Sequence, residues 1–277
     1  MSPSAIWTPT NTNITPSARI HMTLLTASKV KHYFGGLCAV SEFNLELQAG
    51  ELMGIIGPNG AGKTTIFNLI TGVYRASEGS IQFRGTELVG KTPHQITALR
   101  IGRTFQNIRL FRDLSVLDNV RIAHYAQGEY SPLEALLQIG RYQREERRII
   151  DNSRRLLAIF HLEAMAAETA KNLPYGLQRR LEIARALAIG PELLLLDEPA
   201  AGMNPNEIDL LMEFIQWIRK EFHLTILLIE HQMKLVMGIC ERLKVLDFGE
   251  TIADGTPEQI QNNPKVLEAY LGEGPVG

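Results

Sequence analysis

Gly57-Pro58-Asn59-Gly60-Ala61-Gly62-Lys63-Thr64 is the stretch that decides the fold of this 277-residue chain. Its spacing matches Gly-x-x-x-x-Gly-Lys-Ser/Thr, a loop that surrounds the phosphates of a nucleotide. The glycines let successive backbone N–H groups face one anion, and a helix N-terminus adds the positive end of its dipole. The apolar run Leu52–Ile56 predicts a buried strand before the loop, and Thr65–Ile70 predicts a helix after it. This setting favours a nucleotide site over a chance match in a Gly-rich turn.

The loop assigns chemistry to its last two residues. Lys63 is expected to reach the β and γ phosphates, and the Thr64 hydroxyl to bind Mg²⁺. The residues predicted to contact the nucleotide's phosphates are Gly57, Pro58, Asn59, Gly60, Ala61, Gly62, Lys63, Thr64 and Thr65.

A second nucleotide element lies downstream, in Leu193–Pro199, where an apolar run ends in Asp197 and Glu198. A run that is apolar on both faces is typical of a central parallel strand covered by helices. Ligands of open α/β sheets bind at the carboxyl ends of such strands. We therefore expect Asp197 to join the Mg²⁺ shell and Glu198 to polarise an attacking water. A strand that merely ends in two solvated acids is the alternative.

A third apolar strand, Leu224–Ile229, ends in Glu230 and His231. A single histidine is usually a surface or packed residue. His231 nevertheless follows a strand of the same sheet and shares the strand-end layer with Asp197. It is therefore a candidate for contact with the γ-phosphate.

The order of these elements, together with Arg103-Thr104-Phe105-Gln106 and Leu173–Arg180, resembles the ATP-binding subunits of ABC transporters over about residues 24–272. The resemblance implies an α/β fold: a P-loop NTPase core with a mostly parallel, RecA-like sheet, a small antiparallel β-subdomain and an inserted helical subdomain. Short alternating runs between Leu24 and Leu88 independently predict the antiparallel sheet. The pattern turns helical from about Ala98 to Leu187.

The resemblance also implies roles for single residues. Glu198 is similar to the catalytic base and His231 to the residue that senses the γ-phosphate, while Gln106 is similar to the glutamine that joins the metal site to the membrane-domain contact. Phe34 corresponds to an aromatic that stacks on adenine, although such an aromatic is also common in a core. The implied catalytic set is Lys63, Gln106, Glu198 and His231, and the implied metal ligands are Thr64, Gln106 and Asp197.

The family's signature loop usually reads Leu-Ser-Gly-Gly-Gln and contacts the ATP on a facing subunit. Here it reads Leu173-Pro174-Tyr175-Gly176-Leu177, so the implied contact residues are Pro174, Tyr175, Gly176 and Leu177. Pro174 and Leu177 lack the usual hydroxyl and amide. We therefore expect one half of an asymmetric pair, a heterodimer in which a second ATPase subunit supplies a fuller loop.

Within the family, Phe34-Gly35-Gly36, Tyr175-Gly176, Ala200–Pro205 and the ending Glu268–Glu273 resemble ATPases that power branched-chain and neutral amino-acid uptake. Urea-uptake and lipopolysaccharide-export ATPases share several of these marks and remain alternatives. The implied partners are integral membrane permease subunits and, indirectly, an extracytoplasmic binding protein. A peripheral location on the cytoplasmic face of the inner membrane follows from the same resemblance.

Other function classes fit less well. ABC proteins of translation or DNA repair usually carry two fused ATPase domains or a long coiled coil, and a regulatory module without turnover has no need of both Asp197 and Glu198. The stretch Arg141–Arg148 mixes arginines with acids in a chain of formal charge −2, which favours a solvated helix face over nucleic-acid binding. Cys38 and Cys240 have no metal-ligand or redox spacing and suit a reducing compartment.

Composition and capping signals complete the expected organisation. Apolar residues make up 45% of the chain, no apolar run approaches the ~18 residues of a membrane span, and the start lacks a signal-peptide core. Residues 1–22 are rich in Ser, Thr, Pro and Asn and are expected to be a disordered tail, with Met1 or Met22 as the start. Residues 23–277 form the ATP-binding domain, with its helical subdomain at about 98–187. Asn204 and Thr256 are expected to cap helices.

Overall fold

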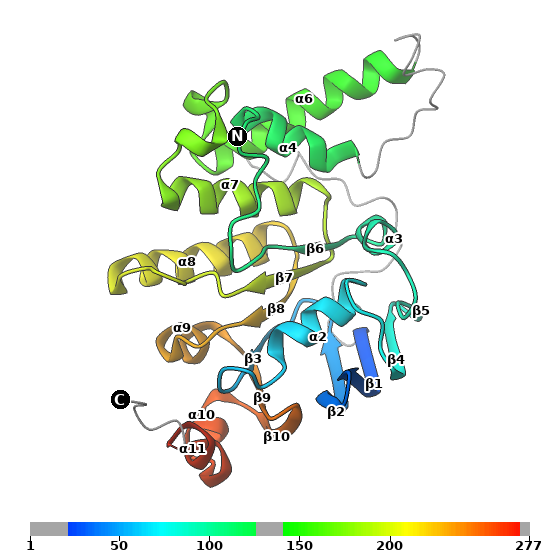
Figure 1. Cartoon of the computed structure of the whole chain (residues 1–277). Coiled ribbons are helices and arrows are strands. Elements are labelled where there is room, and N and C mark those ends of the chain that lie inside the picture. The colour runs from blue at the N-terminus through cyan, green and yellow to red at the C-terminus, as the bar shows by residue number, and fades with distance from the viewer. Residues whose placement is uncertain (1–21, 126–140, 272–277) are drawn as a thin grey trace.

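Two β-sheets carry the chain in the computed structural model, which describes residues 22–125 and 141–271 (Figure 1). The smaller sheet has the order β2-β1-β4-β5, and all its pairings are antiparallel. Its strands are β1 (Thr23–Phe34), β2 (Leu37–Gln48), β4 (Glu78–Phe83) and β5 (Thr86–Glu87). This sheet lies beside the phosphate loop, as the alternating runs predict.

The larger sheet has six strands in the order β10-β9-β3-β8-β7-β6, and only β10 is antiparallel to its neighbour. Its strands are β3 (Leu52–Ile56), β6 (Ile101–Arg103), β7 (Leu193–Asp197), β8 (Thr225–Ile229), β9 (Arg242–Asp247) and β10 (Glu250–Gly255). Every residue of β3, β7 and β8 is buried. The three apolar runs thus form the expected central parallel strands.

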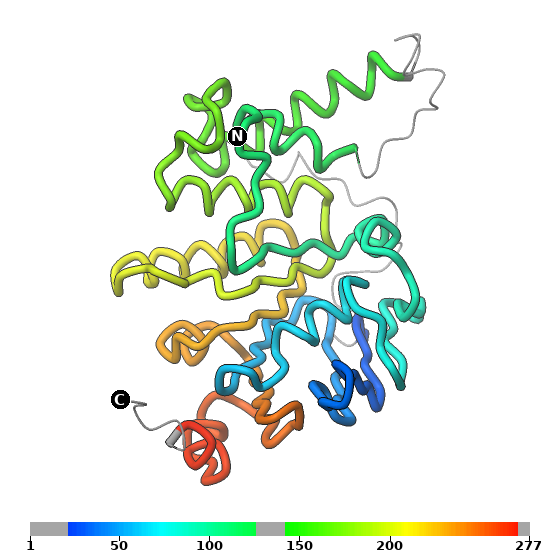
Figure 2. Tube along the Cα trace, in the orientation of Figure 1, coloured from blue at the N-terminus to red at the C-terminus, as the bar shows by residue number. Residues whose placement is uncertain are grey.

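Helices lie on both faces of the larger sheet. They are α2 (Lys63–Ile70), α3 (Pro93–Ala98), α4 (Val116–His124), α6 (Arg141–Ile159), α7 (Tyr175–Ala188), α8 (Pro205–Glu221), α9 (Met233–Ile239), α10 (Pro257–Gln261) and α11 (Pro264–Leu271), with short 3-10 turns η3 (Glu163–Met165) and η4 (Ala170–Asn172). Figure 2 shows the chain leaving β6, passing through α4 and α6, and returning along α7 to β7. Because β6 pairs with β7 in the main sheet, residues 101–103 are a strand inside the stretch expected to be helical.

The core is divided by the larger sheet into two clusters. Side chains alternate across a strand, so Leu194 and Leu196 of β7 pack with the cluster formed by α7, α8 and α9, whereas Leu193 and Leu195 pack with the cluster under α2 and the antiparallel sheet. β7 is therefore packed on both faces, which fixes the position of the residues at its end.

Capping residues start the helices where the sequence indicates. Asn204 accepts from the backbone N–H groups of Asn206 and Glu207, with Pro205 at the first helical position of α8. Thr256 forms the same reciprocal capping box at α10. The sequence favours this helix as the last one, which is wrong because α11 follows it. The buried face of α8 is formed by Ile208, Leu211, Ile215 and Ile218, with Met212 partly buried.

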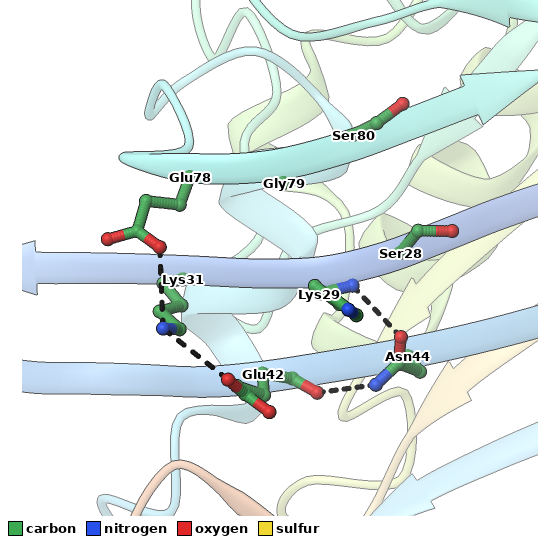
Figure 3. A pocket seen from close by; sticks show the side chains of 8 residues that line it. All are labelled: Ser28, Lys29, Lys31, Glu42, Asn44, Glu78, Gly79 and Ser80. Carbon is green, nitrogen blue, oxygen red and sulfur yellow. Dashed lines mark hydrogen bonds and ion pairs between the residues drawn. The ribbon is translucent and has the colours of Figure 1, made fainter.

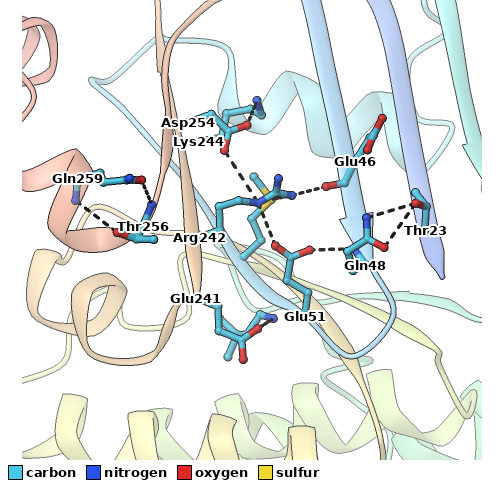
Figure 4. A network of polar contacts seen from close by, with 12 residues as sticks. Thr23, Glu46, Gln48, Glu51, Glu241, Arg242, Lys244, Asp254, Thr256 and Gln259 are labelled. Atoms are coloured by element: carbon cyan, nitrogen blue, oxygen red, sulfur yellow. Dashed lines mark hydrogen bonds and ion pairs between the residues drawn. The ribbon is translucent and has the colours of Figure 1, made fainter. Parts of the chain in front are cut away.

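A polar network joins the start of β9 to the antiparallel sheet (Figure 4). Arg242 contacts Glu51 at 3.0 Å and donates to the backbone oxygen of Glu46 on β2. Lys244, only 5% exposed, pairs with Asp254 of β10 at 2.5 Å. These contacts hold the β9–β10 hairpin against β2.

The charged stretch at the start of α6 faces solvent on one side of the helix and contacts α4 on the other. Arg144, Arg147 and Arg148 are exposed, and Arg148 pairs with Glu145 at 2.8 Å. Glu146 instead accepts from Arg121 of α4 at 3.0 Å.

Within the described residues, no helix is long and apolar enough to cross a membrane, and both cysteines are free. The expected tail, residues 1–22, lies outside the described residues except for Met22.

Candidate nucleotide site

The phosphate loop runs from the end of β3 to the first turn of α2. Gly57, Gly60 and Gly62 have φ values of 144°, 78° and 98°, in the region that glycine favours. A Cβ at Gly57 would lie 2.0 Å from the backbone oxygen of Leu246, so no larger residue fits there. Lys63 Nζ donates to the backbone oxygens of Gly57 and Pro58, each at 2.7 Å, and is therefore held over the loop.

Asp197 ends β7 and forms a buried ion pair with Arg103. Arg103 Nη2 lies 2.8 Å from Asp197 Oδ2, and the two side chains are 6% and 3% exposed. Burial lowers the pKa of the Arg103 guanidinium from its ordinary value, while the Asp197 carboxylate opposes that shift. Arg103 Nη1 also donates to Asn68 of α2 and to Thr71, the C-cap of that helix. Arg103 thus ties the acidic strand end to the phosphate-loop helix.

The second carboxylate oxygen of Asp197 is suited to a cation. Asp197 Oδ1 is buried and makes no hydrogen bond within the described part of the chain, and a buried polar atom normally has a partner. Thr64, exposed in the first turn of α2, and the amide of Gln106 add oxygen donors of the type that Mg²⁺ prefers. The residues present therefore fit the expected metal.

Glu198, Gln106 and His231 come together beside Asp197. Gln106 Nε2 donates to Glu198 Oε2 at 2.6 Å, and His231 Nδ1 lies 3.7 Å from the same oxygen. Glu198 has a φ of 46°, in the left-handed region. A non-glycine residue held there is under strain of the kind found at active sites.

Buried Glu230 holds the backbone around that cluster. Its carboxylate accepts from the N–H groups of Ala200 at 2.7 Å, His231 at 2.9 Å and Gln232 at 3.1 Å. The sequence places Glu230 beside His231 but gives it no role. Three backbone contacts identify it as the support for the His231 turn.

Phe34 lies at the end of β1 and is 44% exposed. Its ring packs edge-on against His32 and Tyr74, at centroid distances of 4.7 and 5.2 Å. One side of the ring is fixed by these neighbours, while the exposed part is free to receive a flat ligand. Stacking of Phe34 on a base stays a prediction.

The signature loop belongs to a different layer from the phosphate loop. Pro174 is the N-cap of α7, and this cap makes no side-chain hydrogen bond. Tyr175 is 53% exposed, whereas Leu177 packs partly against the core. Figure 1 shows α7 beside α4 and α6, away from α2. The exposed N-terminal turn is thus directed at something other than this chain's own phosphate loop.

A polar hollow on the antiparallel sheet is separate from these residues (Figure 3). There Lys31 lies 3.5 Å from Glu42 and 3.3 Å from Glu78. Ion pairs this exposed contribute little free energy, and none of the predicted site residues lines the hollow.

Comparison with known proteins gives the same family over most of the chain. The family model "ABC transporter" matches residues 40–201, and "Branched-chain amino acid ATP-binding cassette transporter" matches residues 250–276. The high-affinity branched-chain amino acid transport ATP-binding protein LivG of Escherichia coli (strain K12) is 47% identical over 250 residues, which cover 90% of this chain and 98% of that protein. The high-affinity branched-chain amino acid transport ATP-binding protein BraF of Pseudomonas aeruginosa is 44% identical over 250 residues, which cover 90% of this chain and 98% of that protein.

A solved structure agrees with these relatives. The ADP conformation of an ATP-binding cassette of an ABC transporter superposes with a TM-score of 0.79 at 31% identity, covering 91% of this chain and all of the other. The phosphate loop, the acidic strand end and these matches lead to one conclusion: the chain belongs to the ATP-binding proteins of ABC transporters and is an ABC-type ATPase.

Proposed function

We propose that the chain is the ATP-hydrolysing subunit of a membrane ABC importer for branched-chain or neutral amino acids. The observation that carries the ATPase part is the convergence of Gln106, Asp197, Glu198 and His231 at the ends of parallel strands. The substrate class is supported by the match of residues 250–276 to the branched-chain amino acid family and by the relatives' names.

The chain's residues divide the reaction among them. Lys63 and the loop N–H groups bind the phosphates, and Phe34 orients the base by stacking. Glu198 Oε2 accepts the proton of the attacking water, with Gln106 and His231 placed around that oxygen. Asp197, Thr64 and Gln106 would hold Mg²⁺. When bound, Mg²⁺ neutralises phosphate charge.

A second ATPase subunit completes the site in this proposal. The α7 N-terminus and Gly176 are available to a facing nucleotide, but Pro174 has no N–H and Leu177 has no side-chain amide. We therefore favour a heterodimer in which the other subunit carries a fuller signature loop. Permease subunits place the pair at the inner face of the membrane and join it indirectly to an extracytoplasmic binding protein.

Purification of the tagged full chain from membranes of its native cells tests the proposal. We expect two integral membrane proteins and a second ATPase to co-purify, and the reconstituted complex to take up radiolabelled leucine in an ATP-dependent manner. A complex carrying Lys63→Ala is the control for that uptake. Recovery with ribosomes or DNA, or uptake of urea but not leucine, would show that the proposed function is wrong.

A further inference from the structure

Arg179 and Glu182 form a buried ion pair one turn apart on α7. Arg179 Nη1 lies 2.7 Å from Glu182 Oε2, and the side chains are 2% and 1% exposed. Two charges removed from water this completely need further hydrogen bonds to offset their desolvation. The partners of those hydrogen bonds indicate the role of the ion pair.

The remaining donors of Arg179 reach two other segments. Nη1 also donates to the backbone oxygen of Phe105 at 2.7 Å, and Nη2 donates to the backbone oxygen of Glu198 at 2.7 Å. Nε lies 3.4 Å from the backbone oxygen of Pro199. The planar guanidinium presents donors in several fixed directions, which the single ammonium of a lysine does not.

Glu182 binds the same neighbouring segment from its other oxygen. Glu182 Oε1 accepts from the backbone N–H groups of Phe105 and Arg109, each at 3.2 Å. The segment 105–109, which carries Gln106, is therefore fixed to α7 near both of its ends.

The segment is also in contact with the Arg103–Asp197 ion pair. The Phe105 ring contacts two guanidinium groups, with the Cζ atom of Arg103 at 4.7 Å and that of Arg109 at 4.3 Å from its centroid. Arg103 in turn holds Asp197. Gln106 therefore lies on a short segment held between the signature helix and the acidic strand end.

We propose that Arg179 and Glu182 are a positioning pair. They hold the Gln106 segment and the main chain of Glu198 to the signature helix α7. Glu198 is therefore oriented towards the attacking water only while α7 and the Gln106 segment move as one unit. The proposal rests on the proposed role of Glu198 as base. A purely structural role is the competing explanation. Buried ion pairs often contribute little net stability, and apolar replacements of similar volume are frequently neutral or stabilising.

The decisive variant replaces both charges, Arg179→Met with Glu182→Leu, in the full chain and in its co-purified complex. We expect a melting temperature close to wild type, ATP affinity within about twofold, and a kcat lower by about ten- to a hundredfold, because small misplacements of catalytic groups have effects of that size. Hydrogen exchange of the Phe105 and Arg109 amides should become faster. If kcat stays within twofold of wild type, the proposal is wrong. It is also wrong if kcat falls only when the melting temperature falls and recovers when stability is restored.

Arg179→Lys covers the case in which the double variant does not fold. It keeps the buried charge but loses the fork, and we expect the same fall in kcat with little change in ATP affinity; an unchanged kcat overturns the proposal. Arg155→Lys, at an exposed position on α6, is the matched control and should keep full turnover. Glu198→Gln is assayed in parallel. If it remains active, the proposed base is wrong; if it is inactive while both pair variants keep turnover, only the positioning role fails.

Discussion

Gln106 Nε2 donates a hydrogen bond to Glu198 Oε2 over 2.6 Å, so the carboxylate proposed as the base is bound to the segment that carries Gln106. The contact joins a loop after β6 to the end of β7, and it occupies the oxygen that lies 3.7 Å from His231 Nδ1. Movement of the Gln106 segment therefore changes the hydrogen bonding of Glu198 directly.

Glu198→Gln should stop hydrolysis while leaving ATP binding intact. The new amide oxygen can still accept from Gln106, so the local shape is kept, but an amide is a poor base. We expect turnover to fall by about 10²-fold or more and ATP-loaded dimers to accumulate, measured by phosphate release and gel filtration with ATP. Glu213→Gln, an exposed acid on α8, is the matched control. Hydrolysis within a few-fold of wild type would show that Glu198 is not the base.

Lys63→Ala should abolish activity mainly through lost nucleotide binding. Lys63 Nζ is held by the Gly57 and Pro58 oxygens in the loop that surrounds the phosphates, where its charge is available to them. We expect ATPase activity to fall by about 10²–10³-fold, together with weaker binding of a fluorescent ATP analogue. Lys265→Ala, on the exposed side of α11, should leave both unchanged. Near-normal affinity and turnover in the Lys63 variant would contradict the assignment.

Short-range patterns predict much of this fold because each one has a local physical cause. The phosphate loop, the three buried strands and the Asn204 cap follow from glycine conformation, two-sided apolarity and side-chain capping, and all are found as expected. The strand β6 is missed because three residues, Ile101–Arg103, are too short to show a period, and only pairing with β7 defines them.

Some site residues are not predicted from the sequence because their roles depend on contacts that form only in the folded chain. Asp197 and Glu198 stand out at a strand end, but Arg103, Arg179 and Glu230 do not. Each of them has at least one partner that is distant in the chain: Asp197 lies 94 residues from Arg103, Phe105 lies 74 residues from Arg179, and Ala200 lies 30 residues from Glu230. The local signal in the sequence is the position of Glu230, a charged residue directly after the apolar run Leu224–Ile229.

Acid should destabilise the chain through His124 at the end of α4. Burial lowers the pKa of His124 to about 4 from an unfolded value of 6.5, and the nearby charge of Arg148 acts in the same direction. The unfolded chain therefore takes up this proton first, and stability falls as pH drops from about 6.5 towards 4. We expect a contribution of about 1 kcal/mol between pH 7 and pH 5.5.

Urea unfolding at both pH values measures that contribution. The His124→Leu variant should lose about 1 kcal/mol less than wild type over this interval, whereas His94→Leu, at an exposed position on α3, should match wild type. Equal pH dependence in wild type and the His124 variant would mean that His124 is not the titrating group.

Restoring the usual signature residues should raise the activity of this chain when it assembles without a partner. Pro174 and Leu177 stand where the family usually has serine and glutamine, while the N-terminus of α7 and Gly176 remain available. In the double variant Pro174→Ser with Leu177→Gln, each copy can offer a hydroxyl and an amide to the ATP of the other. One charge-assisted hydrogen bond is worth about 1.5 kcal/mol, so we expect turnover of the isolated chain to rise about tenfold. The same chemical change at the start of α11, Pro264→Ser with Leu267→Gln, is the matched control and should have no effect, since Leu267 is 50% exposed and outside the proposed interface. A wild-type chain that already forms a fully active homodimer, unimproved by the double change, would refute the asymmetric pair.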